Sequence, residues 1–333
     1  MADAKPAVPP GPPRRRIGAL RVIGDLITVL RANPLTLAGF VLVALIMGTA
    51  VLVAGVPFVS GLFTGHSVEV LPYAPNQIST AVKQGPSLAH PFGTDNVGED
   101  IFSQVLYALP LDLFIGFAVT GFALLVGGLL GLVAGYWDSP GTVGGFSSVA
   151  ILRVTDVFLA FPSLVLALAI TAALGRGTFP AILAIMLSWW PYYVRLTRGE
   201  VLAVKHLPYV TAARGAGVSD LRILRRHILA NILEPLTVYY TMDVGTVLIT
   251  FSTINYVGIG VPLTVPEWGN QIVLYQDFLL NLPWTVAAPG LAIFITVLAF
   301  SLLGDGLRDI LDPRSRRALT RSAGSASAGS EEA

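Results

Sequence analysis

The stretch YVTAARGAGVSDLRILRRHILANI, residues 209–232, is a polar, glycine-containing segment in a chain that is otherwise strongly hydrophobic. Pro208 precedes it and suits the first turn of a short helix over residues 209–214. Gly215 and Gly217 permit the left-handed or sharply turned backbone that would end this helix. The stretch therefore predicts a short helix followed by a glycine hinge.

A second helix is predicted directly after the hinge. Ser219 is a good N-cap, and Asp220 is favourable at the positive end of a helix. Arg222, Arg225 and Arg226 follow on the same predicted helix. Two interpretations are open: an ordinary cytoplasmic loop whose arginines face lipid phosphates, or a docking element for a cytoplasmic protein.

The composition of the whole chain indicates an integral membrane protein. Of the 333 residues, 54% are hydrophobic and only 12% are charged, whereas soluble domains carry about 25% charged residues. A water-facing molecule of this size could not cover itself with so few charges. The chain has no cysteine, which excludes disulfides, thiolate metal sites and a cysteine nucleophile.

Apolar runs on both sides of the polar segment predict an all-α protein with six transmembrane helices. Pro162, Pro191 and Pro289 lie inside these runs and are expected to kink or locally unwind them. The predicted spans cover residues 35–58, 113–136, 157–174, 179–194, 235–260 and 284–304.

The distribution of lysine and arginine predicts the orientation. With the N-terminus in the cytoplasm, nineteen of the 21 basic residues fall on the cytoplasmic side, and only Lys83 and Arg176 fall outside. The opposite orientation would reverse this bias. Both termini are therefore expected in the cytoplasm.

The remaining segments are interpreted from composition and helical spacing. A proline-rich N-terminal tail and a polar C-terminal tail are expected to be disordered, and an amphipathic helix is expected on the membrane surface before the first span. The predicted divisions are the tail 1–13, the surface helix 14–34, the first span 35–58, the extracytoplasmic segment 59–112, the core 113–314 with its cytoplasmic loop 199–232, and the tail 315–333.

Two features inside the spans are candidates for packing or function. Gly127, Gly131 and Gly135 recur at a spacing of four, which favours close helix packing over a chance excess of glycine. Asp243 is an acid within the fifth predicted span, where a charge costs about 3 kcal/mol on insertion scales and is often functional. It is a candidate for the substrate pathway, and the alternative is a structural acid that snorkels or bonds to a neighbouring helix.

Two other motifs are interpreted as structural. WWPYY, residues 189–193, is expected to form an interfacial aromatic belt near the inner end of the fourth span. His90 and Asp95 lie in HPFGTD, whose proline and glycine favour a structural turn over a metal site.

The polar segment also resembles a known family. AARGAGVSDLRILRRHIL is similar to the cytoplasmic EAA loop of the membrane subunits of ABC importers, with Ala212, Ala213, Gly217 and Leu229 matching the family's pattern. The sequence departs from it at three positions: Thr211 stands where glutamate is usual, His227 where isoleucine is usual and Ala230 where proline is usual.

Further segments extend the resemblance over roughly residues 15–314. HPFGTDNVGEDIFSQVLY, EWGN and LLGDGLRDILDPR resemble segments of the C-type membrane subunits of dipeptide and oligopeptide importers. Glu99 and Gln104 depart from that pattern, because arginine is usual at both positions. The segment around residues 63–85 is atypical.

The resemblance implies a type I ABC importer permease in the bacterial cytoplasmic (inner) membrane, with partners that supply the energy. It implies a homologous second permease subunit, two cytoplasmic ATPase subunits that bind ATP and magnesium, and an extracytoplasmic substrate-binding protein. No cofactor, metal, catalytic residue or nucleic-acid partner is expected on this chain. The residues expected to dock on an ATPase are Tyr209, Ala212, Ala213, Arg214, Gly217 and Asp220.

The resemblance favours dipeptides or oligopeptides as cargo, and the alternative is the same machine importing nickel, haem or another small solute. The chain has no phosphate-binding loop of the Gly-x-x-x-x-Gly-Lys-Ser/Thr type, so ATP is expected to bind elsewhere. A rival class is a secondary transporter driven by an ion gradient, which normally has paired ionisable residues in its spans. The hypothesis of an intramembrane enzyme has less support than that of a secondary transporter, because the predicted spans contain no plausible pair of catalytic residues.

Overall fold

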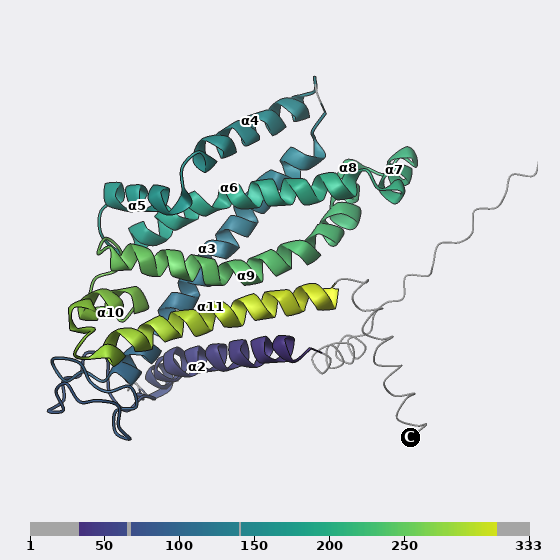
Figure 1. Cartoon of the computed structure of the whole chain (residues 1–333). Helices are drawn as coiled ribbons and strands as arrows, with labels where there is room; N and C mark the ends of the chain where they lie inside the picture. The colour runs from purple at the N-terminus through teal and green to yellow at the C-terminus, as the bar shows by residue number, and fades with distance from the viewer. Residues whose placement is uncertain (1–32, 65–67, 140, 312–333) are drawn as a thin grey trace, which may run out of the picture.

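The computed structural model describes residues 33–64, 68–139 and 141–311. Within these ranges the regular elements are helices (Figure 1). The predicted tails 1–13 and 315–333, and all but the end of the predicted surface helix 14–34, lie outside the described residues.

Most of the helices pack side by side as an elongated bundle (Figure 1). Short helices cap its two ends, and α8 continues through one π-helical turn, Leu224–Ile228, into α9. The α-helices are α2 Pro34–Thr64, α3 Ile101–Tyr136, α4 Val143–Leu159, α5 Ser163–Leu174, α6 Thr178–Lys205, α7 Pro208–Gly215, α8 Asp220–Ile223, α9 Leu229–Tyr256, α10 Trp268–Tyr275 and α11 Pro283–Leu311.

Three helices in the described part of the chain are long and apolar enough to cross a membrane on their own, namely α2, α3 and α11. The pair α4 and α5 meets the same criteria together, but it is bent by 84°. The third predicted span, 157–174, is therefore wrong as one continuous helix, whereas the kink predicted at Pro162 is confirmed. Proline cannot donate a backbone hydrogen bond, and it disfavours helical backbone in the residue before it.

Other helix boundaries also differ from those predicted. Helix α3 begins at Ile101, well before position 113, because the Asp100 side chain accepts a hydrogen bond from the Ser103 backbone N–H and caps the helix. Helix α6 continues through Pro191, and α11 continues through Pro289. The local unwinding predicted at these two prolines is therefore absent, as is common where neighbouring helices support the chain.

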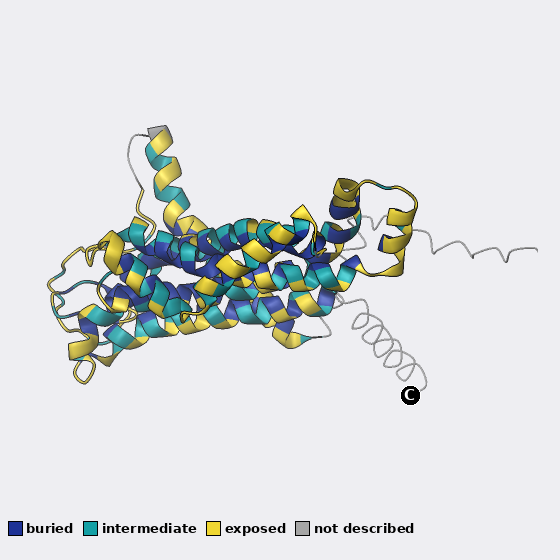
Figure 2. Ribbon diagram, turned by 90° about the horizontal axis from the view of Figure 1, so that it is seen from above, coloured by how far each residue is buried: buried dark blue, intermediate teal, exposed yellow. Residues whose placement is uncertain are grey.

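Close packing of α3 against α6 forms the centre of the molecule. Figure 2 shows buried residues along the interior of the bundle. Gly127, Gly131 and Gly135 lie on the face of α3 that meets α6. A Cβ atom on Gly127 would lie 2.3 Å from the carbonyl oxygen of Trp190, and one on Gly131 would lie 2.5 Å from that of Val194. Any larger residue at these positions would push the two helices apart.

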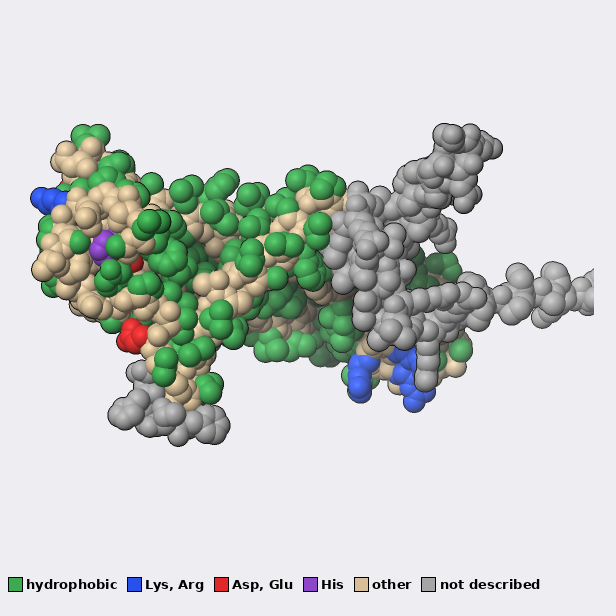
Figure 3. Space-filling view, turned by 90° about the horizontal axis from the view of Figure 1, so that it is seen from below, with side chains coloured by type: hydrophobic (Ala, Val, Ile, Leu, Met, Phe, Trp, Pro, Cys, Tyr) green, Lys and Arg blue, Asp and Glu red, His purple; other side chains and the backbone are tan. Residues whose placement is uncertain are grey.

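The two ends of the bundle carry different elements (Figure 1). Helices α7 and α8 lie at the same end as the beginning of α2 and the end of α11. The irregular segment 68–100 and α10 lie at the opposite end. Figure 3 shows a face on which hydrophobic side chains cover the length between the ends, while lysine and arginine side chains lie at the ends.

Candidate functional site

The polar segment of the sequence forms the short helix α7, which is stopped by a glycine. Gly217 has a positive φ of 77°, and the N–H of Val218 donates to the carbonyl oxygen of Ala213 at 3.1 Å, which is the bond that closes a Schellman motif. The predicted helix and its glycine hinge are confirmed at Gly217. Gly215 is the last residue of α7 and has no positive φ, so the left-handed backbone that the two glycines were expected to permit lies at Gly217.

The second predicted helix, α8, is short and continues directly into the next element. Ser219 occupies the N-cap position in extended backbone, but its side chain makes no capping hydrogen bond. After one π-helical turn, Leu224–Ile228, the chain enters α9. The segment therefore projects as a hairpin of short helices from the ends of α6 and α9 (Figure 1).

Buried apolar side chains fix this hairpin to the bundle. Val210 of α7, Ile223 of α8 and Ile228 are fully buried in one cluster with Val201 of α6. Next to this cluster, the ammonium group of Lys205 donates to the carbonyl oxygen of Gly135 at 3.3 Å, and burial lowers the pKa of Lys205. The base of the hairpin is therefore held rigidly, while its outer face is free of the bundle.

Tyr136, at the end of α3, connects the two short helices. Its hydroxyl donates to Oδ1 of Asp220 at 2.5 Å, and the guanidinium carbon of Arg214 lies 5.6 Å from the centre of its ring. Two predicted docking residues thus meet on one aromatic side chain. The sequence pattern gave no signal for Tyr136, since it appeared only as the last residue of a predicted span.

The outer face of the hairpin combines apolar and basic side chains. Leu207 and Tyr209 are exposed, and Leu221 is 66% exposed. Leu221 also lines a surface cavity of about 490 Å³ together with Ser219 and the arginines of α8 and the turn after it. Of the six predicted docking residues, all are exposed except Ala213, which is half-buried.

Asp243 lies midway along α9 and faces α6. Its Oδ2 accepts hydrogen bonds from Nε1 of Trp189 at 2.6 Å and from the hydroxyl of Tyr193 at 3.1 Å. These side chains line a cavity of about 540 Å³ that also includes Tyr192 and Tyr239. The cavity lies between two helices that carry aromatic rings and one carboxylate.

The predicted aromatic belt is wrong for most of its residues. Trp189, Trp190 and Tyr193 are buried, and they lie in the middle of α6 rather than at its end. Only Tyr192 is well exposed, at 47%. The tryptophan and tyrosine that bond to Asp243 were missed because the sequence could not show which face of α6 meets α9.

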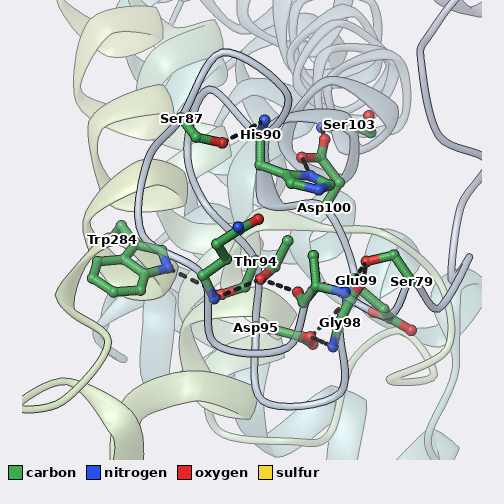
Figure 4. A network of polar contacts seen from close by, with 12 residues as sticks. Ser79, Ser87, His90, Thr94, Asp95, Gly98, Glu99, Asp100, Ser103 and Trp284 are labelled. Atoms are coloured by element: carbon green, nitrogen blue, oxygen red, sulfur yellow. Dashed lines mark hydrogen bonds and ion pairs between the residues drawn. The ribbon is translucent and has the colours of Figure 1, made fainter.

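The segment before α3 is an ordered cap, whose contacts appear in Figure 4. Oδ1 of Asp95 accepts the backbone N–H groups of residues 97–99, and His90 pairs with Asp100 at 2.9 Å rather than with Asp95. The predicted turn is therefore confirmed. The indole of Trp284 donates to the carbonyl oxygen of Thr94 at 3.1 Å, which attaches the cap to α11.

The same cap carries one residue that departs from the family pattern. Glu99 is half-buried, accepts a hydrogen bond from the Gln104 side chain, and lines a polar cavity of about 530 Å³ at the end of the bundle opposite to α7. Burial and the negative charge of Asp95 raise the pKa of Glu99.

Two buried acids behind this cap were not singled out from the sequence. Glu267 caps α10 by accepting from the backbone N–H of Asn270 at 2.7 Å and from the Ser252 hydroxyl at 3.1 Å. Asp112 of α3 accepts from the backbone N–H of Trp268 at 3.3 Å. The EWGN motif pointed to this position, but nothing in the sequence showed that Asp112 meets it.

Comparisons with known proteins are consistent with this architecture. Residues 127–317 match the family described as "Binding-protein-dependent transport system inner membrane component". One chain of a structure reported as inward facing conformations of the MetNI methionine ABC transporter matches this chain with a TM-score of 0.52 and 18% identity. It covers 66% of this chain and 98% of that one, so the two share a fold.

Several proteins are more similar in sequence. The probable D,D-dipeptide transport system permease protein DdpC of Escherichia coli (strain K12) is 37% identical, covering 87% of this chain and 91% of its own. The dipeptide transport system permease protein DppC of Alkalihalophilus pseudofirmus is 36% identical, covering 94% and 98%. The glutathione transport system permease protein GsiD of Pectobacterium atrosepticum is 38% identical, covering 70% and 75%. The chain therefore belongs to the family of inner membrane components of binding-protein-dependent transport systems, and it has the type I ABC importer permease fold that its sequence predicts.

Proposed function

We propose that this permease subunit imports dipeptides or oligopeptides and forms half of the translocation pathway with a homologous second permease subunit. Two cytoplasmic ATPase subunits bind the ATP and magnesium, and an extracytoplasmic substrate-binding protein delivers the cargo. One observation carries the choice of cargo: relatives whose names specify dipeptide transport cover 87% and 94% of this chain. Another relative, at 38% identity, is named as a glutathione transport system permease, so glutathione is the second candidate cargo.

We propose six spans in the bacterial cytoplasmic membrane: α2, α3, the bent pair α4–α5, α6, α9 and α11. The beginning of α2, the end of α11 and the α7–α8 hairpin lie at one end of the bundle, and Arg222, Arg225 and Arg226 lie on that hairpin or on the π-helical turn after it. An excess of basic residues marks the cytoplasmic side. This end therefore faces the cytoplasm, together with both termini.

The α7–α8 hairpin is proposed as the docking element for an ATPase subunit. Its exposed face carries Leu207, Tyr209 and Leu221, which are large apolar side chains outside the predicted spans. Exposed apolar side chains beside polar ones are typical of protein interfaces. Because the base of the hairpin is buried against α3 and α6, movement of a docked ATPase would be transmitted to the spans.

The exposed face of α9 is proposed as the wall of the pathway. Tyr239 and Thr246 are exposed there, on the same helical face as the half-buried Asp243. By contrast, the exposed large side chains of α2 and α11 in the middle of each helix are aliphatic or phenylalanine, as a lipid-facing surface requires. A polar face at the same depth is stable only against another protein or a water-filled path.

Copurification from native membranes, followed by reconstitution, tests the proposal. A tagged chain should bring down two ATPase subunits and one homologous permease subunit. In vesicles that contain this complex and its binding protein, ATP should drive uptake of labelled dialanine. If the vesicles take up nickel chelates or haem but no peptide, the proposed peptide cargo is wrong. If uptake follows an ion gradient and needs no ATP, the protein is not part of an ATP-driven importer.

A further inference from the structure

The cavity between α6 and α9 contains a carboxylate, that of Asp243, which has no cationic partner among the residues that the structure describes. Both hydrogen bonds to Asp243 fall on Oδ2, so Oδ1 accepts none from the residues that the structure describes. The ion pairs of the described ranges lie elsewhere and involve Asp100, Asp138 and Asp156. An acid that serves only to hold helices together would be expected to use both oxygens or to face a cation.

Aromatic rings complete the lining of this cavity. Trp189 and Tyr193 fix the orientation of the carboxylate through their N–H and O–H groups. Tyr192 and Tyr239 line the same cavity and are 47% and 48% exposed, so their rings are accessible to a ligand. A carboxylate among aromatic rings is suited to a positively charged amine, which the rings attract through their electron-rich faces.

The size and position of the cavity fit a small peptide. Its volume of about 540 Å³ lies within the range of about 300–1,000 Å³ that is usual for small-molecule sites. It opens on the exposed face of α9 that carries Tyr239 and Thr246. An ammonium group crossing an apolar bilayer is costly to desolvate, and a carboxylate at mid-depth offsets part of that cost.

We propose that Asp243, together with the surrounding tyrosine and tryptophan rings, binds the free amino group of the cargo during its passage. This inference rests on the proposed function, because peptides with a free N-terminus carry such an ammonium group. Asp243 supplies the negative charge, Trp189 and Tyr193 position it, and Tyr192 and Tyr239 contact the cation. The site selects cargo by charge rather than by side chain.

Direct binding to the complex of permease and ATPase subunits, purified without the binding protein, tests this site alone. Calorimetry compares dialanine with N-acetyl-dialanine. Asp243→Asn should weaken the binding of dialanine by at least about tenfold, because a neutral amide no longer attracts the amine, and it should leave N-acetyl-dialanine unaffected. Asp243→Glu should restore part of the affinity. Asp305→Asn, the same change at an exposed position on α11, is the control and should bind dialanine normally.

A second variant covers the case in which Asp243→Asn does not assemble. Thr246 is exposed and lies one turn from Asp243, so Thr246→Lys places a permanent ammonium group beside the carboxylate. It should abolish dialanine binding and uptake, whereas the Asp305→Asn control should retain both. If Thr246→Lys or Asp243→Asn binds and imports dialanine as well as the wild type, the inference is wrong. A wild-type complex that imports no peptide at all would instead refute the proposed function, and this inference with it.

Discussion

Gly217 is the residue at which backbone conformation alone determines the shape of the α7–α8 hairpin. Its φ is 77°, and a Cβ atom built on it would meet nothing within 4 Å. The cost of a side chain there is therefore conformational, about 1–2 kcal/mol for a left-handed residue. We expect Gly217→Val to redirect α7 and to reduce the amount of ATPase that copurifies with the permease, while membrane insertion stays normal.

Two variants serve as controls for this prediction. Gly215 also has open space around it but lies in helical backbone, so Gly215→Ala should leave ATPase copurification unchanged. Gly217→Asn should recover part of the association, because asparagine tolerates left-handed backbone better than valine does. Normal copurification and coupled transport with Gly217→Val would show that the hairpin does not dock.

Asp220 also acts at the residue scale, and its expected effect is larger than its position at a helix end suggests. A charge near the start of a helix contributes about 0.3–1 kcal/mol, but Asp220 also accepts the hydroxyl of Tyr136. A double-mutant cycle with Asp220→Ala and Tyr136→Phe should therefore show coupling of about 0.5–1.5 kcal/mol in the unfolding free energy of the purified subunit. Additive effects of the two substitutions would mean that this hydrogen bond does not stabilise the hairpin.

At the scale of elements, the contact between α3 and α6 depends on glycine. The Cβ of Gly131→Ala would lie 2.5 Å from a backbone oxygen of α6, which no side-chain rotation relieves. We expect the substitution to destabilise the subunit by about 1–3 kcal/mol, as overpacking commonly does, and to lower its thermal unfolding midpoint. Gly121→Ala is the matched control on the same helix, since its Cβ would meet nothing within 4 Å. Equal unfolding midpoints for the two variants would contradict the close packing.

At the scale of the whole molecule, the orientation in the membrane can be tested by cysteine labelling without first removing native cysteines. Because the chain has no cysteine, a single cysteine at Lys83 or at Arg225 provides a unique label. An impermeant thiol reagent added to intact cells should modify the first and reach the second only after the membrane is opened. The reverse labelling pattern would invert the topology and place the hairpin on the wrong side for an ATPase.

The class of protein and the elements of the hairpin could be predicted because they depend on local or additive properties. The low content of charged residues indicates that much of the protein surface faces lipid rather than water, and this inference does not depend on the fold. The helix over residues 208–215 follows from Pro208 at its start and a glycine after its end. The break near Pro162 follows from the missing N–H of proline. Each of these inferences needs only a few neighbouring residues or a sum over the chain.

The sequence by itself thus determined the membrane class, the family and the local form of the α7–α8 hairpin. Only the tertiary structure decided which side chains meet: Asp243 with Trp189 and Tyr193, and Asp220 with Tyr136. These contacts join different helices, and they depend on how far each helix is rotated about its axis and shifted along its neighbour. That register is set by close packing of whole helix faces, such as the glycine face of α3 on α6, and no short stretch of sequence contains it.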